Sequence, residues 1–143
     1  MTAAERVATV RLALQAAATG NAALLERACT ADVEGWSPTT TVTSREALLA
    51  DVRGRSGAFS DVELVLDPVD AVGDDKVIAE WRLAATHSGA LELEHGTRLD
   101  PTGRRVELRG VLVAEFQGDR IKRFRQYWDE AALLEGLGML PGS

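Results

Sequence analysis

The hydrophobic residues in the first part of the chain recur at helical spacing. Segment 2–18 is rich in alanine, contains no proline or glycine, and is expected to form a helix that ends at Gly20. A short helix is predicted over residues 22–29. A third helix begins after Ser44, whose side chain can cap the free N–H groups of the first turn, and fades near Gly54. The apolar positions that define the first helix are Val7, Val10, Leu14 and Ala17.

Beyond Gly57 the apolar positions alternate with polar ones, as expected for strands that are buried on one face. In segment 61–72, Pro68 predicts a sheet edge or a bulge. The other strands are expected over 31–37, 77–87 and 105–116 and in a segment that ends at Trp128, before a short C-terminal helix. Three helices followed by a run of antiparallel strands predict an α+β fold, with helices packed on one side of a curved, mostly antiparallel sheet. Such a fold leaves a deep, mostly apolar cavity between helices and sheet.

Length and composition narrow the classes of function. The 143 residues are expected to form one domain, 1–143, and the net charge of −6 argues against a nucleic-acid partner. No apolar run approaches the roughly 18 residues of a membrane-spanning helix, so no membrane partner is expected. The N-terminus lacks the pattern of a signal peptide, and Cys29 is a single cysteine, so we expect a cytoplasmic protein. Two histidines on unrelated segments and no Gly-rich phosphate loop predict neither a metal nor a cofactor.

The strand that ends at Trp128 carries a polar residue on its apolar face. Alternate side chains of a strand share a face, so Gln126 lies between Phe124 and Trp128. The opposite face carries Arg123, Arg125 and Tyr127. A buried amide that lacks hydrogen-bond partners costs about 1–3 kcal/mol. Gln126 is therefore either tied to other protein groups or faces a cavity in which a ligand completes its hydrogen bonds.

Two further residues are candidates for acid–base chemistry. His87 ends the apolar face of strand 77–87, where an imidazole can exchange a proton near neutral pH. Alternatively, His87 contacts water at the strand end or bonds a loop carbonyl. Asp129 precedes Glu-Ala-Ala-Leu-Leu, the pattern of a helix N-cap, but a register slip of one residue would make it the acid–base candidate in the cavity. Segment 91–96 is expected to be a strand or a flap in which His95 is solvated.

Three stretches of sequence carry a family resemblance. They are Gly118-Asp-Arg-Ile with Tyr127-Trp-Asp and Leu133-Leu-Glu-Gly-Leu-Gly, then Trp81-Arg-Leu-Ala-Ala-Thr-His-Ser-Gly, and Pro101-Thr-Gly-Arg-Arg-Val. With the order of elements, they resemble SnoaL-like proteins, a branch of the NTF2-like superfamily that includes polyketide cyclases. Ketosteroid isomerases and limonene epoxide hydrolases are distant relatives. The resemblance implies a small cone-shaped domain, but not a reaction, because the superfamily hosts several enzyme classes and non-catalytic binders.

The chain departs from these relatives at the positions that carry their chemistry. The aspartate that serves as acid or base in SnoaL-like cyclases and epoxide hydrolases falls on Gln126, whose amide cannot titrate near neutral pH. The other catalytic positions of the epoxide hydrolases fall on Trp81 and Leu83. The general base of the ketosteroid isomerases falls on Gly35, and their oxyanion-binding tyrosine on Ala13. These departures argue against epoxide hydrolysis, ketosteroid isomerisation and aldol chemistry of the SnoaL type.

Two functions remain compatible with the sequence. The first is an enzyme of secondary metabolism, a cyclase or isomerase that holds a hydrophobic, polyketide-like substrate in a reactive conformation. Gln126, His87 and the Trp81 indole N–H would supply hydrogen bonds to developing charge. The second is a non-catalytic ligand-binding or accessory domain that keeps the cavity. In both cases the bound molecule is expected to contact Leu14, Ala17, Ser37, Trp81, Leu83, Leu108, Leu112, Phe124, Trp128 and Leu133.

Charged residues of both signs share the outward faces of the later strands. They are Arg82, Arg109, Arg123 and Arg125, interleaved with Glu80, Glu107 and Glu115. Because such a mixture can complement itself, we expect a two-fold homodimer through this outer sheet face. Salt bridges on an exposed surface would give the same pattern.

Overall fold

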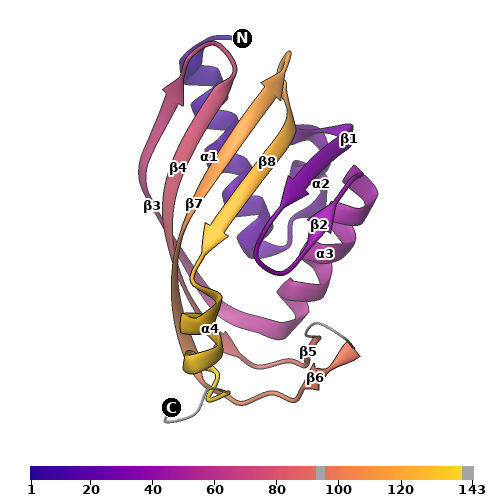
Figure 1. Cartoon of the computed structure of the whole chain (residues 1–143), viewed down its shortest axis with the longest axis vertical. Helices are drawn as coiled ribbons and strands as arrows, with labels where there is room; N and C mark the ends of the chain where they lie inside the picture. Colours follow the sequence, from indigo (N-terminus) through magenta and orange to yellow (C-terminus); the bar gives the residue numbers. More distant parts are fainter. Residues whose placement is uncertain (93–95, 140–143) are drawn as a thin grey trace.

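The order of helices and strands is that of an α+β domain (Figure 1). The computed structural model describes residues 1–92 and 96–139. The helices are α1 (Ala3–Thr19), α2 (Ala22–Ala28), α3 (Arg45–Ala58) and α4 (Glu130–Gly136). The strands are β1 (Cys29–Trp36), β2 (Thr41–Val42), β3 (Phe59–Val72), β4 (Lys76–His87), β5 (Leu91–Glu92), β6 (Arg98–Leu99), β7 (Arg105–Gln117) and β8 (Arg120–Trp128).

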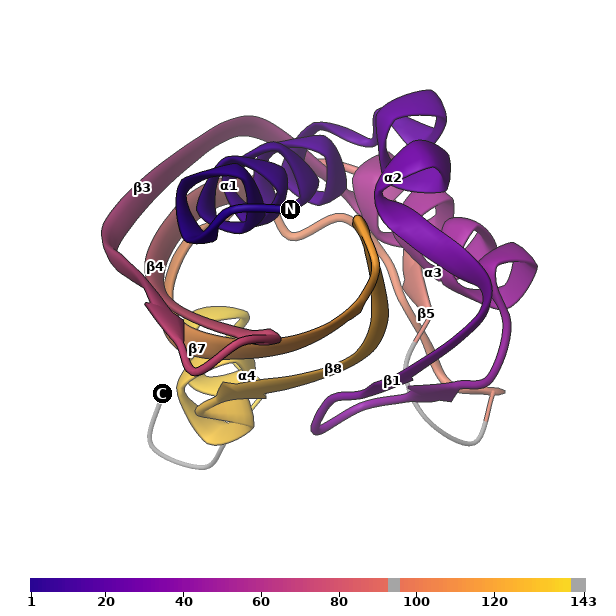
Figure 2. The same cartoon turned by 90° about the horizontal axis from the view of Figure 1, so that it is seen from above.

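Six of the strands form one curved sheet in the order β2-β1-β8-β7-β4-β3. All neighbouring strands pair antiparallel except β1 and β8, which pair parallel. Seen from above, α1, α2 and α3 lie across the open side of the curve (Figure 2). The predicted architecture, with three N-terminal helices on one side of a mostly antiparallel sheet and a short helix after it, is confirmed.

The helix ends follow from local sequence. Thr2 accepts a hydrogen bond from the backbone N–H of Glu5 at 3.1 Å, and the Glu5 carboxylate accepts one from the Thr2 backbone, which completes a capping box. Gly20 ends α1 at φ 74°, in the left-handed region that glycine adopts without a steric penalty. Ser44 caps α3 by accepting from the Ala47 N–H at 3.1 Å, as predicted.

β3 is one of the two edge strands of the sheet, and its pairing with β4 is interrupted twice. One shift of register falls between Ser60 and Glu63, where Asp61 has a φ of 51°. The second falls between Leu66 and Val69 and so includes Pro68, which has no N–H to donate to a neighbouring strand. Both the edge position and the irregularity expected from Pro68 are confirmed. The strand begins at Phe59, earlier than expected, because it follows α3 without a loop.

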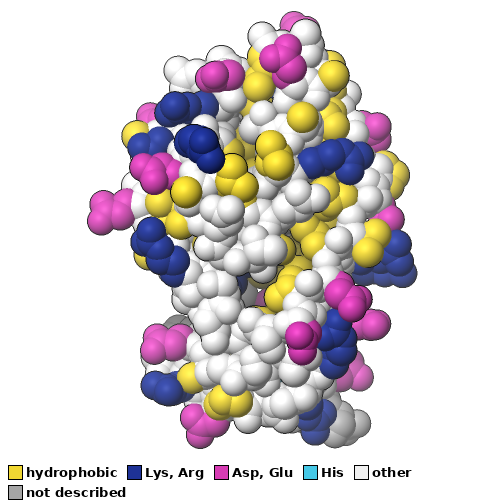
Figure 3. Space-filling view, turned by 180° about the vertical axis from the view of Figure 1, so that it is seen from behind, with side chains coloured by type: hydrophobic (Ala, Val, Ile, Leu, Met, Phe, Trp, Pro, Cys, Tyr) yellow, Lys and Arg dark blue, Asp and Glu magenta, His cyan; other side chains and the backbone are white. Residues whose placement is uncertain are grey.

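The core fills the space between the inner face of the sheet and the helices. The inward residues of β4 and β7 alternate with outward ones, so that Val77, Ala79 and Ala114 are fully buried. Val10 of α1 and Val52 of α3 close over them from the helix side. Viewed from behind, this helix side carries scattered charged residues of both signs, and its surface is hollowed near the middle beside apolar side chains (Figure 3).

The segment after β4 forms a small separate element. Leu91–Glu92 pairs antiparallel with Arg98–Leu99 as a two-stranded sheet. The rest of the expected strand or flap, including His95, lies outside the described residues. None of the helices in residues 1–92 and 96–139 has the length and apolarity needed to cross a membrane.

Candidate functional site

An apolar cavity of about 70 Å³ lies between the helices and the inner face of the sheet. The end of α1, the middle of α3, the β1–β2 turn and the inner faces of β7 and β8 all contribute to its wall. Its lining consists of Ala13, Leu14, Ala17, Leu25, Cys29, Gly35, Trp36, Ser37, Thr40, Val42, Leu48, Asp51, Val52, Arg55, Leu112, Ile121, Phe124, Gln126 and Trp128. This is the candidate ligand site of the protein.

The cavity includes most of the residues expected to contact a ligand. Those that line it are Leu14, Ala17, Ser37, Leu112, Phe124, Gln126 and Trp128. The expectation for Trp81, Leu83, Leu108 and Leu133 is corrected, because none of them lines the cavity. Leu83 and Leu108 pair with each other and are the next inward-facing pair after Trp81 and Gly110. The large indole ring of Trp81 therefore lies between these two leucines and the cavity. Leu133 is half-buried on α4, which packs beside β7.

Among the described residues, the side chain of Gln126 is anchored by one hydrogen bond, which comes from β4 on the far side of β7. The indole N–H of Trp81 donates to Gln126 Oε1 at 2.9 Å. Trp81 itself is 7% exposed and is not among the lining residues, so it lies behind Gln126 as seen from the cavity. The alternatives left open for Gln126 are therefore both realised in part: its oxygen is tied to the protein, and its side chain lines the cavity.

Two glycines allow aromatic rings to lie flat against the inner face of the sheet. Gly110 pairs with Trp81 on β4 and with Trp128 on β8, and a methyl group at Gly110 would overlap the Trp81 ring. A methyl group at Gly35 would overlap the ring of Phe124 in the same way. Because a side chain at either position would displace its ring, the two glycines determine how deep the cavity is.

Trp128 is held from the side of α4. Its indole N–H donates to Glu130 Oε2 at 2.7 Å, and its ring meets that of Trp81 edge-on at a centroid distance of 6.3 Å. An edge-to-face pair of this kind adds about 0.5–1.5 kcal/mol to the burial of the two rings. The two indoles therefore form a rigid wall beside Gln126, and neither indole N–H is directed into the cavity.

Two other polar residues in the lining are committed to local structure. The Ser37 hydroxyl accepts hydrogen bonds from the backbone N–H groups of Thr39 and Thr40, at 3.4 and 3.2 Å, within the β1–β2 turn. Burial raises the pKa of the Cys29 thiol to about 11, although Arg45 opposes the shift. At neutral pH Cys29 is therefore a neutral, apolar part of the wall.

Asp51 and Arg55 bring charge to the cavity from α3. Their side chains form an ion pair one helical turn apart, at 3.0 Å, and both are partly exposed. Asp51 is the one carboxylate among the described lining residues, and sequence reasoning missed it. The helical period contained the signal, because residues three and four apart share a face and Asp51 stands at those spacings from Leu48 and Arg55.

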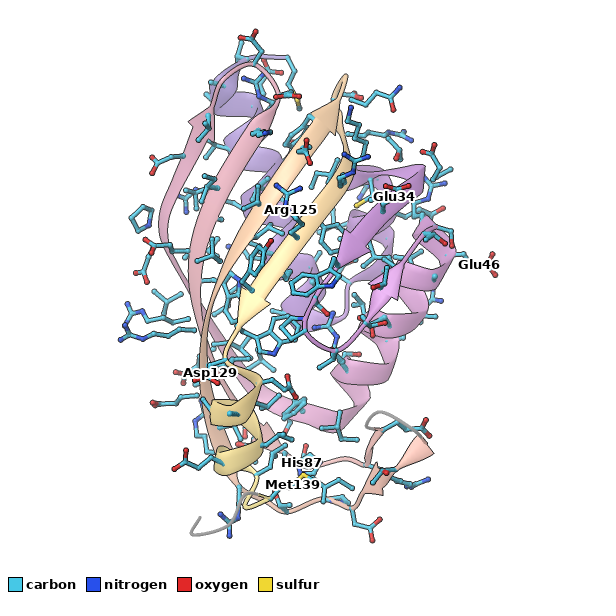
Figure 4. All side chains as sticks on the ribbon, viewed as in Figure 1. Glu34, Glu46, His87, Arg125, Asp129 and Met139 are labelled. Carbon is cyan, nitrogen blue, oxygen red and sulfur yellow. The ribbon has the colours of Figure 1, made fainter. Side chains whose placement is uncertain are left out.

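His87 does not reach the cavity. The histidine is fully buried, and its Nδ1 accepts a hydrogen bond from the backbone N–H of Thr102 at 3.1 Å, with the Thr102 hydroxyl at 3.0 Å. Its ring packs against Phe59 at a centroid distance of 5.6 Å. The expectations of a cavity residue beside Gln126 and of a water contact at the strand end are both corrected, because the loop after β6 folds over the imidazole. Figure 4 shows His87 at the far end of the sheet from β1, near Met139.

Asp129 is the N-cap of α4, where β8 ends (Figure 4). Its carboxylate accepts a hydrogen bond from the backbone N–H of Ala132 at 3.1 Å, and the residue is exposed. The slip of register that would have turned it inward does not occur, since Gln126 pairs with Leu112 and lines the cavity. Asp129 therefore does not replace the aspartate that the family carries at position 126.

The outer face of the sheet carries the expected mixture of charges. Arg125 donates to Glu115 at 2.8 Å, and this hydrogen bond lowers the pKa of the Glu115 carboxyl. Arg82 pairs with Asp67, and Arg123 with Glu34. Between the charged rows lie exposed apolar residues, among them Ile78 (37% exposed), Trp36 (42%) and Tyr127 (47%), and the rings of the last two pack against each other.

The part of the chain that the structure describes contains no group of three or more histidine, cysteine or acidic side chains arranged to hold a metal ion.

Comparison with known proteins identifies relatives of the same fold. Residues 10–124 match the model of the SnoaL-like domain. A SnoaL-like polyketide cyclase candidate from Jannaschia sp. CCS1 has a TM-score of 0.83 at 18% identity, and the match covers 97% of this chain and 95% of that one. AclR from Streptomyces galilaeus, suggested to be a hydroxylase, has a TM-score of 0.81 at 25% identity, with 99% and 86% covered. IdmH from Streptomyces antibioticus, a polyketide cyclase candidate, has a TM-score of 0.75 at 21% identity, with 93% and 98% covered. No curated protein matches the sequence.

Proposed function

Because the chain belongs to the SnoaL-like family, we propose that it binds a small hydrophobic, polyketide-like molecule in the cavity and acts on it as a cyclase or isomerase of secondary metabolism. One observation carries this proposal: Gln126 lines an otherwise largely apolar cavity between Phe124 and Trp128. A ligand with an apolar body and one polar group would match that lining, because the walls bind its body and the amide fixes its orientation.

Catalysis in this cavity would depend on the conformation of the substrate. Gln126 can form hydrogen bonds but cannot take up a proton near neutral pH. Holding a flexible chain with its reacting carbons in contact can remove several kcal/mol from the barrier of a ring closure without an acid or base on the protein (about 7–11 kcal/mol in the best cases). Any proton transfer would then involve solvent or Asp51, the carboxylate that α3 contributes to the wall.

A synthetic aryl-capped linear tetraketone tests this function. In buffer such a chain closes carbocyclic rings in several ways. In each, a methylene C–H gives up its proton, the carbon bonds to a ketone carbon, and the ketone oxygen takes up a proton as its double bond to carbon becomes single. We expect the protein to accelerate one closure at least tenfold, as measured by liquid chromatography and mass spectrometry. Gln126→Leu should lose that selectivity, while the exposed-surface variant Asp32→Asn should keep it. A product distribution identical to that in buffer, despite saturated binding, would leave only the alternative below.

That alternative is a non-catalytic ligand-binding or accessory domain. The same Gln126 favours it, because a glutamine in place of the aspartate implied by the family resemblance is one methylene longer and can form hydrogen bonds but cannot titrate near neutral pH. The two functions differ in one measurement: binding of the tetraketone without a change in its rate or products supports the binding domain. We assign His87 no part in either function, since its Nδ1 is occupied by Thr102.

We also propose that the outer sheet face forms a two-fold homodimer. The exposed apolar side chains Ile78 and Tyr127 and the half-buried Val111 lie between rows of charge, in which Arg109 and Glu107 make no ion pair with other described residues. A two-fold axis through the apolar rows would bring the charged rows of one copy opposite those of the other. Complementary charges would then specify the register of the two sheets.

A further inference from the structure

We propose that Trp81 locks the amide of Gln126 so that the cavity offers its ligand a hydrogen-bond donor, and that the site therefore selects apolar molecules bearing a carbonyl or enolate oxygen. This inference rests on the proposed function, and it narrows the ligand class by naming the group that must meet Gln126. In it, Trp81 is a positioning residue that acts through Gln126.

The orientation of the amide follows from the chemistry of its partner. An indole N–H can only donate, so the atom of Gln126 that lies 2.9 Å from Trp81 Nε1 must be the carbonyl oxygen. The amide group is planar, and its nitrogen therefore points away from Trp81. If the amide turned over, two donors would face each other, and the indole N–H would lose its hydrogen bond.

Trp81 cannot move to release the amide. Its ring lies against Gly110 on one side and meets the ring of Trp128 at 6.3 Å on another, and it is almost completely buried. Trp128 is itself held by its hydrogen bond to Glu130 at 2.7 Å. Each group that fixes the amide is thus fixed by a further one, which is the arrangement that gives a binding site its geometric precision.

The amide nitrogen has no competing acceptor nearby. Within residues 1–92 and 96–139, Gln126 Nε2 makes no hydrogen bond, whereas the Ser37 hydroxyl is held in its turn and Asp51 is paired with Arg55. The remaining lining is mostly apolar. A ligand that meets the N–H with an oxygen gains a hydrogen bond, and one that meets it with an apolar or donor group leaves it unsatisfied. The gain is larger for an oxygen on which negative charge develops, because hydrogen bonds to charged acceptors are stronger.

Three small bicyclic molecules of similar size separate these cases: 1-indanone has an acceptor, indole has a donor, and indane has neither. Their dissociation constants can be measured by ¹H–¹⁵N NMR titration of the wild-type protein. We expect 1-indanone to bind about fivefold to tenfold tighter than indane, the effect of one net hydrogen bond. Indole should bind no tighter than indane. The side-chain NH₂ signals of Gln126 should shift with 1-indanone and stay in place with indane.

Two matched variants test the role of Trp81. Trp81→Phe keeps an aromatic ring but removes the N–H donor, so the amide of Gln126 can turn over. The preference for 1-indanone over indane should then fall to less than twofold. Indole should gain affinity relative to indane. Tyr127→Phe removes a polar group from an aromatic ring of β8 that is exposed on the outer face and does not line the cavity, and it should keep the wild-type preference. If all three molecules bind wild-type protein equally, or if Trp81→Phe and Tyr127→Phe behave alike, the inference is wrong while the ligand-binding function stands. If none of the three binds, both fail.

Discussion

The packing of Trp81 on Gly110 gives the sharpest prediction for stability. In Gly110→Ala the added methyl group would overlap the indole ring, which cannot retreat because Trp128 lies beside it. Overpacking in a core costs about 1–3 kcal/mol. Displacing the indole from Gln126 adds about 1–3 kcal/mol, since a buried amide oxygen loses its donor. We therefore expect the free energy of unfolding to fall by about 2–6 kcal/mol, a large part of the total for a domain of this size.

Urea unfolding followed by circular dichroism measures this loss. Gly54→Ala is a matched control in which the change in unfolding free energy should have the opposite sign. Gly54 lies inside α3, and no atom lies within 4 Å of an added methyl group. The substitution should therefore stabilise the protein by about 0.5–1 kcal/mol. The cause is tested by repeating Gly110→Ala in a Trp81→Leu background. Without the indole the alanine should be neutral or slightly stabilising, because a glycine inside a strand is itself unfavourable. A cost of the same size in both backgrounds would refute the proposed overlap.

Four further outcomes are expected. The hydrogen bond from Arg125 lowers the pKa of the Glu115 carboxyl below the ordinary 4.5. The ionised carboxylate therefore stabilises the folded state at pH values above its unfolded-state pKa, and this stabilisation is lost as the pH falls through its folded-state pKa. The difference in unfolding free energy between wild type and Glu115→Gln should thus shrink in acid, and a difference independent of pH from 7 to 3 would contradict this prediction. The Cys29 thiol is buried and has a pKa near 11. At pH 8 it should therefore react with a disulfide reagent only as fast as the protein opens. Equal reaction rates in native and urea-unfolded protein would show instead that the thiol is accessible. His87→Leu removes the acceptor for the backbone N–H of Thr102 and should lower the unfolding free energy by about 1–3 kcal/mol. The affinity for 1-indanone should not change. A loss of affinity at unchanged stability would show that His87 belongs to the ligand site. Light scattering should give twice the chain mass of 15.3 kDa, and Val111→Asp on the outer face should halve it, whereas a monomeric wild type at micromolar concentration excludes the dimer.

The features that could be predicted from the amino-acid sequence are those that depend on neighbouring residues. Ser44 and Asp129 cap helices because a cap needs a partner only three residues away. Gln126 was placed on the inner face because side chains alternate along a strand whatever lies beside it. Pro68 predicted an irregular edge strand because it has no N–H for a neighbouring strand.

Contacts between groups that are far apart in the sequence could not be predicted, because they depend on how the elements pack together. Trp81 and Gln126 are 45 residues apart, and their hydrogen bond depends on the register of β4 and β8 against β7, which no local pattern specifies. His87 has the inward parity that its strand predicts. However, the course of a loop placed Thr102 on its ring and removed it from the candidate site.

The position of α3 decided the charge at the cavity in the same way. Asp51 belongs to an ordinary ion pair of a helix surface, and it lines the cavity only because α3 packs against β1 with that face turned inward. Alternation along β4 and β7 also predicted Leu83 and Leu108 correctly as inward residues, but not that they lie beyond the Trp81 ring. The face on which a residue lies follows from the local repeat of the backbone. Its place along the cavity depends on the size and packing of side chains from other elements, which the repeat does not contain.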